Sequence, residues 1–180
     1  PNGELHVWFL DAGQADSSLL VCDGQAMLID GGNVDDASYV VASLEQYGVT
    51  SLDYVINTHC DEDHVGCLAG VLAKFPAEHV WSSTAEYGTK AFSNFVKYAN
   101  GQGRAIEIPS PGDTFTLGEA EITMLGQLRD YENNNENSIV LRVDYGETSF
   151  LFTGDMGITA EDELVESGAR LDATVLKVGH

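Results

Sequence analysis

Short apolar runs with strand-like spacing alternate along the chain with longer segments of helical spacing. We expect strands at residues 5–10, 17–22, 26–29, 52–57, 79–82, 115–117, 121–125, 138–144, 149–152 and 173–178. We expect helices from residue 35 or 36 to about 47, from His64 to about 75, and over residues 86–100 and 159–167. The Asp23-Gly24 dipeptide predicts a hairpin turn. Because strands lead into helices and back, with hairpins between them, the pattern predicts an α/β fold.

One arrangement occurs twice in this pattern. A strand ending near Asp30 is followed by a helix and then by a strand ending near His59, and Asp155 and His180 stand in the same relation later in the chain. In open α/β sheets, ligands bind at the carboxyl ends of the strands. If two such units face each other, these four side chains meet at one edge of the fold.

The composition is that of one globular domain with a strongly acidic surface. The chain has 180 residues, of which 43% are hydrophobic and 21% charged, and we expect a single domain over residues 1–180. No apolar run reaches the roughly 18–20 residues that cross a bilayer. Eight Lys and Arg residues against 29 Asp and Glu residues give a net charge of −21. Because such a surface repels polyanions and the basic residues are scattered, we expect no basic nucleic-acid-binding patch.

The segment from Thr58 to Gly66 contains a dense set of metal-binding side chains. His59, Asp61, Asp63 and His64 fall within six consecutive residues, directly after an expected buried strand. Imidazole and carboxylate groups together suit Zn²⁺, Mn²⁺ and related divalent ions. If alternate side chains of the loop point the same way, His59, Asp61 and Asp63 share one concave face, and His64 joins them from the next helix. The alternative is a solvated acidic loop with incidental histidines.

This cluster resembles the His-x-His-x-Asp-His signature of the metallo-β-lactamase superfamily, in a His-x-Asp-x-Asp-His form. Residues 9–17 (FLDAGQADS) are more specifically similar to the opening of the hydrolase domain in ComEC-type DNA-uptake competence proteins. Further similar segments follow in order, at residues 28–32 (LIDGG), 137–142 (NSIVLR), 152–155 (FTGD) and 176–180 (LKVGH). The resemblance runs from about residue 5 to residue 180, and it implies an αββα sandwich with a dinuclear metal site at one edge.

The resemblance also implies a role for each acidic and imidazole residue of the site. One metal ion would be held by Asp63, His64 and His180, the other by His59 and Asp61, and Asp155 would bridge the two. Asp30 matches the family's buried acid, which orients the ligands from behind. Asp16 either does similar work or stabilises a turn.

The chain departs from the family pattern at one ligand. The superfamily usually places a further His between the first cluster and the bridging Asp, and here only His79 lies there, too early in the sequence. Asn134, Asn135 or Asn137 occupies the corresponding region, and we take Asn137 as the candidate that positions substrate or a metal-bound water. Because one metal position becomes richer in oxygen ligands, we expect Mn²⁺ to be preferred over Zn²⁺, or only one ion to bind tightly.

A second departure is the end of the sequence. The family motif normally continues past His180 with another His, a Gly and a Ser, and then with more strands and a final helix. The resemblance therefore implies a sandwich truncated at its C-terminus, in which the ligand His180 is mobile or unmetallated.

These residues predict a metal-dependent hydrolase that uses a metal-bound hydroxide, with Asp61 and Asp63 taking direct part in catalysis. The resemblance implies a phosphodiesterase or nuclease that acts on DNA, with single-stranded DNA as the candidate substrate, beside a membrane-channel domain of a longer protein, outside the cytoplasm. Two alternatives remain at this point: hydrolysis of a small ester, lactam or thioester at the same site, and a catalytically degenerate metal-binding module. No Ser nucleophile elbow, catalytic Cys/His signature or phosphate-cradling Gly loop competes with the metal site.

Overall fold

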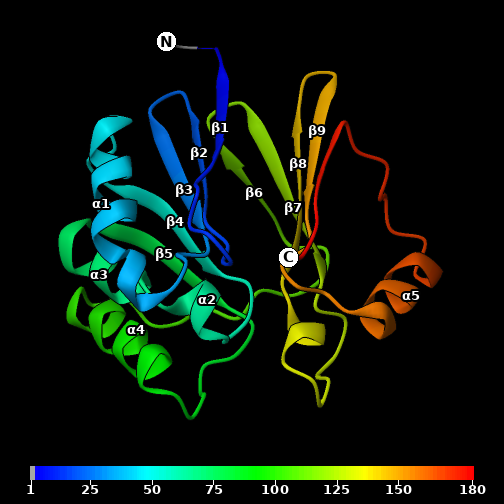
Figure 1. Ribbon diagram of the computed structural model, residues 1–180. Helices are drawn as coiled ribbons and strands as arrows, with labels where there is room; N and C mark the ends of the chain where they lie inside the picture. The colour runs from blue at the N-terminus through cyan, green and yellow to red at the C-terminus, as the bar shows by residue number, and fades with distance from the viewer. Residues whose placement is uncertain (1–2) are drawn as a thin grey trace.

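A computed structural model describes residues 3–180 and shows two β-sheets with helices on their outer sides (Figure 1). The strands are β1 (Leu5–Phe9), β2 (Ser18–Cys22), β3 (Gln25–Ile29), β4 (Leu52–Asn57), β5 (Ala77–Ser82), β6 (Thr114–Leu117), β7 (Ala120–Gly126), β8 (Val140–Tyr145), β9 (Thr148–Phe152) and β10 (Val175–Lys177). The α-helices are α1 (Ala37–Gln46), α2 (Glu62–Val65), α3 (Leu68–Lys74), α4 (Lys90–Gly101) and α5 (Ile158–Glu166). Two 3₁₀ turns, η1 (Val34–Asp36) and η2 (Asn135–Asn137), precede α1 and β8.

The first sheet has the order β1-β2-β3-β4-β5. β1, β2 and β3 are antiparallel, and the hairpin between β2 and β3 turns at Asp23 and Gly24, whose φ angles are +51° and +83°. Such positive angles match the right-handed twist of a two-residue hairpin, which confirms the predicted turn. β3, β4 and β5 are parallel and are linked by helices.

The second sheet has the order β10-β9-β8-β7-β6. Its strands are antiparallel except for β10, which runs parallel to β9 and is reached through α5. Both strand–helix–strand units predicted from the sequence are therefore present, one as β3-α1-β4 and the other as β9-α5-β10. Each unit places the carboxyl ends of two neighbouring strands at one edge.

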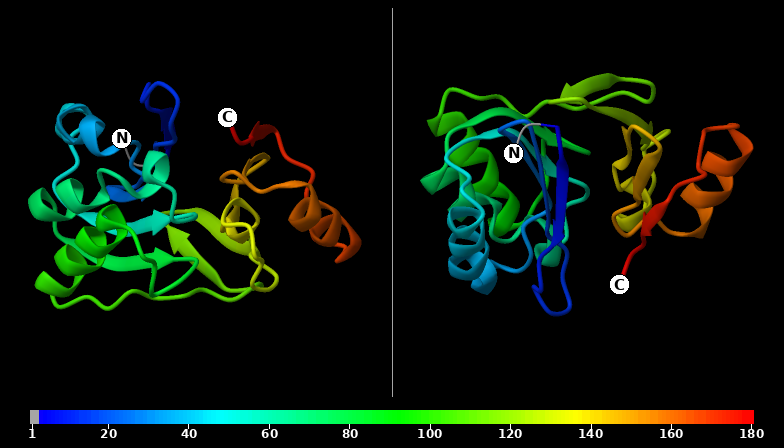
Figure 2. Two further views of the ribbon diagram at one scale, coloured as in Figure 1. Left: turned by 60° about the horizontal axis from the view of Figure 1, so that its bottom comes forward. Right: turned by 90° about the horizontal axis from the view of Figure 1, so that it is seen from above.

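The layers follow the predicted αββα order. Helices α1, α3 and α4 cover the outer face of the first sheet and α5 lies outside the second (Figures 1 and 2). The core under α1, α3 and α4 includes Val40, Leu44, Leu68, Phe92 and Phe95. The core between the sheets includes Met27, Ile56, Ile122, Leu141 and Phe152, and a smaller cluster under α5 contains Val140, Leu151 and Leu164. Burial of these three apolar clusters holds the layers together.

The prediction of a single helix from His64 to about residue 75 is wrong in its bounds and in the number of helices. The structure has two helices, because α2 begins at Glu62, inside the acidic cluster, and α3 begins at Leu68. Gly66 lies between them, and a Cβ atom there would lie 2.4 Å from both the carbonyl oxygen of Glu62 and the backbone nitrogen of Val34. The chain therefore passes directly against η1 at this point, and Asp63 and His64 lie in a helical turn rather than in an extended loop.

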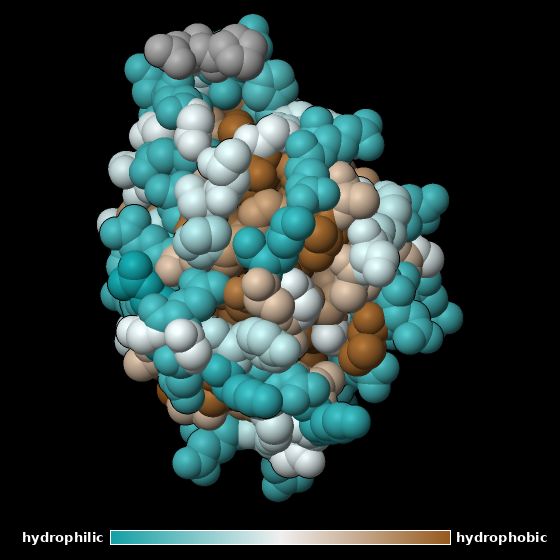
Figure 3. All heavy atoms as spheres, turned by 90° about the vertical axis from the view of Figure 1, so that its left-hand side faces the viewer, coloured by the Kyte–Doolittle hydropathy of each residue, from teal (hydrophilic) through white to brown (hydrophobic). Residues whose placement is uncertain are grey.

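The outer surface is mixed in character. Hydrophilic and hydrophobic residues are interspersed on the face that Figure 3 shows, which is the left-hand side of Figure 1. Among residues 3–180, no helix combines the length and the apolar character needed to span a bilayer.

Candidate metal centre

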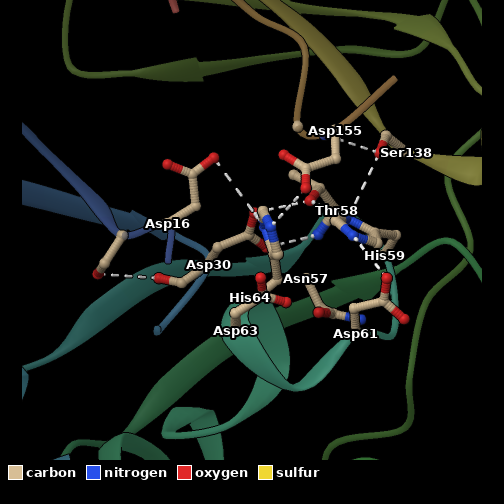
Figure 4. Close-up of polar contacts among 12 residues, drawn as sticks. Asp16, Asp30, Asn57, Thr58, His59, Asp61, Asp63, His64, Ser138 and Asp155 are labelled. Atoms are coloured by element: carbon tan, nitrogen blue, oxygen red, sulfur yellow. Dashed lines mark hydrogen bonds and ion pairs between the residues drawn. The ribbon is translucent and has the colours of Figure 1, made fainter. Parts of the chain in front are cut away.

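The candidate site lies where the two strand–helix–strand units meet. Asp30 follows β3, His59 lies two residues beyond β4, Asp155 lies three residues beyond β9, and His180 lies three residues beyond β10. Asp30, His59, His64 and Asp155 converge in the close-up of Figure 4. The structure thus brings together the strand ends that the sequence pattern placed at one edge.

One set of candidate ligands consists of Asp63, His64 and His180, whose ligand atoms all lie within 4.8 Å of one another. His180 Nε2 is 3.3 Å from Asp63 Oδ2. These three residues are the set that the resemblance assigned to one metal ion. An imidazole pair with one carboxylate is a common donor set for Zn²⁺ and related ions.

A second set consists of His59, His64 and Asp155, again within 4.8 Å. Asp155 Oδ2 lies 3.3 Å from His64 Nε2 and 3.7 Å from His180 Nε2. Asp155 is therefore placed between the two sets, which is the position that a bridging carboxylate needs. Asp61 lies further out, with Oδ2 3.6 Å from His59 Nε2 and 43% of its side chain exposed.

Three buried polar atoms of the site, His59 Nε2, His64 Nε2 and Asp155 Oδ1, make no hydrogen bond of good geometry, although His64 Nε2 lies 3.3 Å from Asp155 Oδ2. Buried polar atoms are almost always satisfied in folded proteins, so a group of unsatisfied ones needs a physical explanation. The two nitrogens and the oxygen belong to the ligand types that divalent transition-metal ions bind. The residues present therefore fit a divalent ion.

Asp30 orients this ligand set from behind. The residue is 1% exposed, and its carboxylate accepts hydrogen bonds from the backbone nitrogen and Oγ1 of Thr58, at 2.7 and 2.6 Å, with His64 Nδ1 2.8 Å away. When Nδ1 of His64 donates to Asp30, Nε2 faces the metal position. The backbone of Asp30 has a φ of +58°, an angle that non-glycine residues rarely adopt and that these contacts hold in place.

Nearby carboxylates raise the pKa values of the imidazoles, and burial lowers them. Burial lowers the pKa of His64, but Asp30 and Asp155 more than offset it and raise that pKa to about 10. Burial and the neighbouring His64 together lower the pKa of His59. Burial raises the pKa of Asp155, but the imidazoles, chiefly His64, outweigh it and hold that pKa below its usual value. Without a metal ion, His59 therefore offers a free nitrogen lone pair, whereas His64 carries a proton that an ion would displace.

Ser138 and Thr58 contact the ring of His59. Thr58 Oγ1 lies 3.2 Å and Ser138 Oγ lies 3.4 Å from His59 Nδ1. Ser138 Oγ also accepts a hydrogen bond from the backbone nitrogen of Asp155, at 3.1 Å. Ser138 is a contact residue that the sequence did not single out, although it stands beside Asn137 in one of the segments that carry the family resemblance.

The asparagine that contacts the candidate ligands is Asn134 rather than Asn137. Asn134 Nδ2 donates to Asp61 Oδ1 at 2.7 Å. The side chain of Asn137 instead accepts from Gln127 Nε2 and from the backbone nitrogen of Tyr131, both at 2.8 Å, so it organises the loop before β8. Of the two asparagines, Asn134 is therefore the one beside a candidate ligand, and the role predicted for Asn137 stays a prediction.

Asp16 lies at the edge of the site, and neither role that the sequence left open for it is decided. Its backbone forms hydrogen bonds with Asp63 and Gly32, at 3.0 and 2.7 Å. Its carboxylate forms an ion pair with Lys177 and lies 4.0 Å from His64 Nδ1. Burial lowers the pKa of Lys177 to about 8. This ion pair, which the sequence did not predict, connects the loop after β1 with β10.

Comparison with known proteins shows the family. The family model for the metallo-beta-lactamase superfamily matches residues 10–179, and the chain belongs to that superfamily. Within it, the chain is similar to three curated proteins of bacterial competence and recombination. It is 25% identical to ComE operon protein 3 of Bacillus subtilis, 30% to competence protein ComA of Neisseria gonorrhoeae and 28% to recombination protein 2 of Haemophilus influenzae, over 99%, 100% and 95% of this chain. It spans only 26%, 24% and 20% of their lengths.

Solved structures confirm the fold. A metallo-β-lactamase of Cronobacter sakazakii superimposes with a TM-score of 0.67 at 18% identity, over 97% of this chain and 74% of that one. The subclass B3 enzyme MEM-A1, isolated from a soil metagenome library, gives a TM-score of 0.69 at 15% identity, over 97% and 76%. At such low identity the likeness establishes the αββα architecture alone.

Proposed function

We propose that this chain is a metal-dependent phosphodiesterase domain that cleaves DNA, within a longer protein of DNA uptake. The observation that carries the proposal is the meeting of three unsatisfied buried ligand atoms, on His59, His64 and Asp155, in a chain similar to competence proteins. Because the chain matches about a quarter of those relatives, the rest of such a protein would supply further parts, including a membrane channel. We accordingly place the domain outside the cytoplasm, beside the membrane.

The chain's own residues supply the binding of the ions and the control of protons. Asp63, His64 and His180 would hold one ion, His59 and Asp61 the other, and Asp155 would lie between them. A bound divalent ion lowers the pKa of water toward neutrality and polarises a phosphoryl oxygen. Asp61, which is 43% exposed, is the ligand carboxylate best placed to exchange a proton with a leaving group.

The two ion positions are unequal in this proposal. The first position has two imidazoles of its own, whereas the second has His59 and Asp61. The family usually adds a further His to the second position, and here Asn134 instead donates a hydrogen bond to Asp61. Oxygen-rich positions favour Mn²⁺ relative to Zn²⁺. We therefore propose one tightly held ion and a second, weaker position that Mn²⁺ fills better than Zn²⁺.

The test is hydrolysis of three substrates by the purified chain with added Mn²⁺ or Zn²⁺. Methyl p-nitrophenyl phosphate and single-stranded DNA should be cleaved, and a chromogenic β-lactam should not. Asp63→Ala should abolish both cleavage reactions, whereas the control Asp162→Asn, an exposed carboxylate of α5, should leave them unchanged. Turnover of the β-lactam alone would refute the proposal, as would tight binding of metal without any phosphodiester cleavage.

A further inference from the structure

A polar hollow opens beside the Asp61 side of the metal centre. It has a volume of about 270 Å³ and lies between the segment after β5 and the loop before β8. Asn134, which lines the hollow, donates its side-chain hydrogen bond to Asp61. Tyr87 also lines the hollow, and the charge of Asp61 contributes to raising its pKa, although burial contributes more. Through Asn134 the hollow therefore adjoins Asp61, whereas the candidate ligands themselves lie outside its lining.

Two aromatic rings line this hollow, and each packs against another side chain. The ring of Tyr87 is 38% exposed and rests edge-on against the buried Phe92 of α4, with the ring centroids 6.1 Å apart. The ring of Tyr131 lies under the guanidinium of Arg129, 4.0 Å from its centroid, and its hydroxyl donates to Glu163 at 2.8 Å. Rings that are fixed before binding lose little conformational entropy when a ligand stacks on them.

The remaining lining groups favour a neutral polar ligand over an anionic one. The hollow also contains the amides Gln127 and Asn134 and the acids Glu86 and Asp130. The nearest cation, Arg129, is already paired with Glu163, with Nη2 2.7 Å from Oε1. Phosphate would meet carboxylates here without an available positive charge. A flat heterocycle with amide-like edges, in contrast, can stack on a tyrosine and donate to the side-chain oxygen of Gln127, whose Nε2 already donates to Asp130 and Asn137.

We propose that this hollow binds one nucleobase of the DNA strand whose phosphodiester is at the metal centre, with Tyr87 as the stacking residue. This inference rests on the proposed function, and it explains how the protein would bind DNA without a basic surface. The volume of about 270 Å³ lies just below the roughly 300–1,000 Å³ of pockets for drug-sized ligands, so it suits a single ring system. Binding through bases rather than phosphates requires single-stranded DNA, because a duplex buries its base faces in the stack.

Two chromogenic esters separate base binding from phosphodiester hydrolysis. Thymidine 5′-(p-nitrophenyl phosphate) carries a base, and methyl p-nitrophenyl phosphate carries none, while both release the same leaving group. Tyr87→Ala should lower kcat/KM for the thymidine ester about 5-fold to 150-fold more than for the methyl ester, the range expected for the loss of one stacked base. Tyr87→Phe, which keeps the ring, should retain the preference for the thymidine ester. Tyr98→Ala is the matched control, because Tyr98 lies on α4 and is 40% exposed.

A second measurement does not depend on turnover. Titration of the isotope-labelled wild-type chain with uncharged thymidine should shift the NMR signals of the Gln127 and Asn134 side-chain amides, with a dissociation constant that changes little with salt. Tyr87→Ala should weaken this binding, and Tyr98→Ala should not. Thymidine binding without hydrolysis of either ester would refute the proposed function and leave the base site standing. Absence of thymidine binding, or equal losses on both esters in Tyr87→Ala, would overturn the base site even if the methyl ester is hydrolysed.

Discussion

Thr58 is the residue through which the buried acid and the first imidazole of the site are connected. It is 1% exposed, and its hydroxyl donates to Asp30 at 2.6 Å while lying 3.2 Å from Nδ1 of His59. Thr58→Val removes this hydroxyl and keeps the shape of the side chain. Thr58→Ser keeps the hydroxyl and removes a methyl group, so the two variants separate the hydrogen bond from the packing.

The expected cost of Thr58→Val follows from these contacts. A hydrogen bond to a charged group contributes about 1.5–3 kcal/mol to stability. Asp30 keeps the contact of His64 Nδ1 at 2.8 Å, so its carboxylate is not left without a partner and the cost stays within that range. His59 Nδ1 keeps only the 3.4 Å contact of Ser138, which no longer fixes the ring well. Loss of such an orienting contact typically weakens metal binding about 10-fold to 100-fold.

Two measurements check this prediction. Urea unfolding of the metal-free protein, followed by tryptophan fluorescence, should show the loss of about 1.5–3 kcal/mol in Thr58→Val. Competition with a chromogenic chelator should show weaker Zn²⁺ binding in Thr58→Val and near wild-type binding in Thr58→Ser. The serine variant should lose only about 0.8 kcal/mol of stability, the contribution of one buried methyl-sized group. Equal metal affinities for the two variants would refute the role assigned to the hydroxyl.

Three further predictions concern other parts of the site. Gly66→Ala should cost about 1–3 kcal/mol or more in urea unfolding, because its Cβ would lie 2.4 Å from two backbone atoms, and unchanged stability would contradict that contact. Below about pH 10 His64 carries a proton that a bound ion must displace, so the apparent metal affinity should rise about tenfold per pH unit up to that pH. Calorimetry measures this affinity, and a flat profile would argue against His64 as a ligand. Asn134→His should add an imidazole beside Asp61 and raise the Zn²⁺ stoichiometry determined by elemental analysis toward two; an unchanged value would exclude that position.

The sequence predicts the strand ends of the site well, because hydrophobic periodicity and turn residues are local signals. The strand predicted at residues 52–57 is found as β4 with the same bounds, and it places His59 beside Asp30. Parallel pairing of β3 with β4 and of β9 with β10 then follows from the intervening helices. Two short repeats of one pattern thus suffice to locate the edge where Asp155 meets His64.

The contacts that the sequence did not reveal are those set by loop geometry or by long-range packing. Which asparagine faces Asp61 depends on η2, a single 3₁₀ turn that no periodic pattern announces. The close approach of Gly66 to η1, at the end of α2, is likewise a long-range contact. Lys177 and Asp16 are separated by 161 positions, so only the packing of the two halves of the fold brings them together. In the sequence, Lys177 is one of several scattered basic residues.

Metal binding would also affect how firmly β10 is attached to the rest of the fold. β10 pairs with β9 through only three residue pairs, and the Asp16–Lys177 ion pair is a further link from it to the first half of the chain. His180 follows β10, whereas Asp63 belongs to α2, so an ion held by both would connect the two halves directly. At a concentration of 100 times its dissociation constant, such an ion stabilises the folded state by about 2.7 kcal/mol. We therefore expect an ion bound by both residues to fix His180 beside α2.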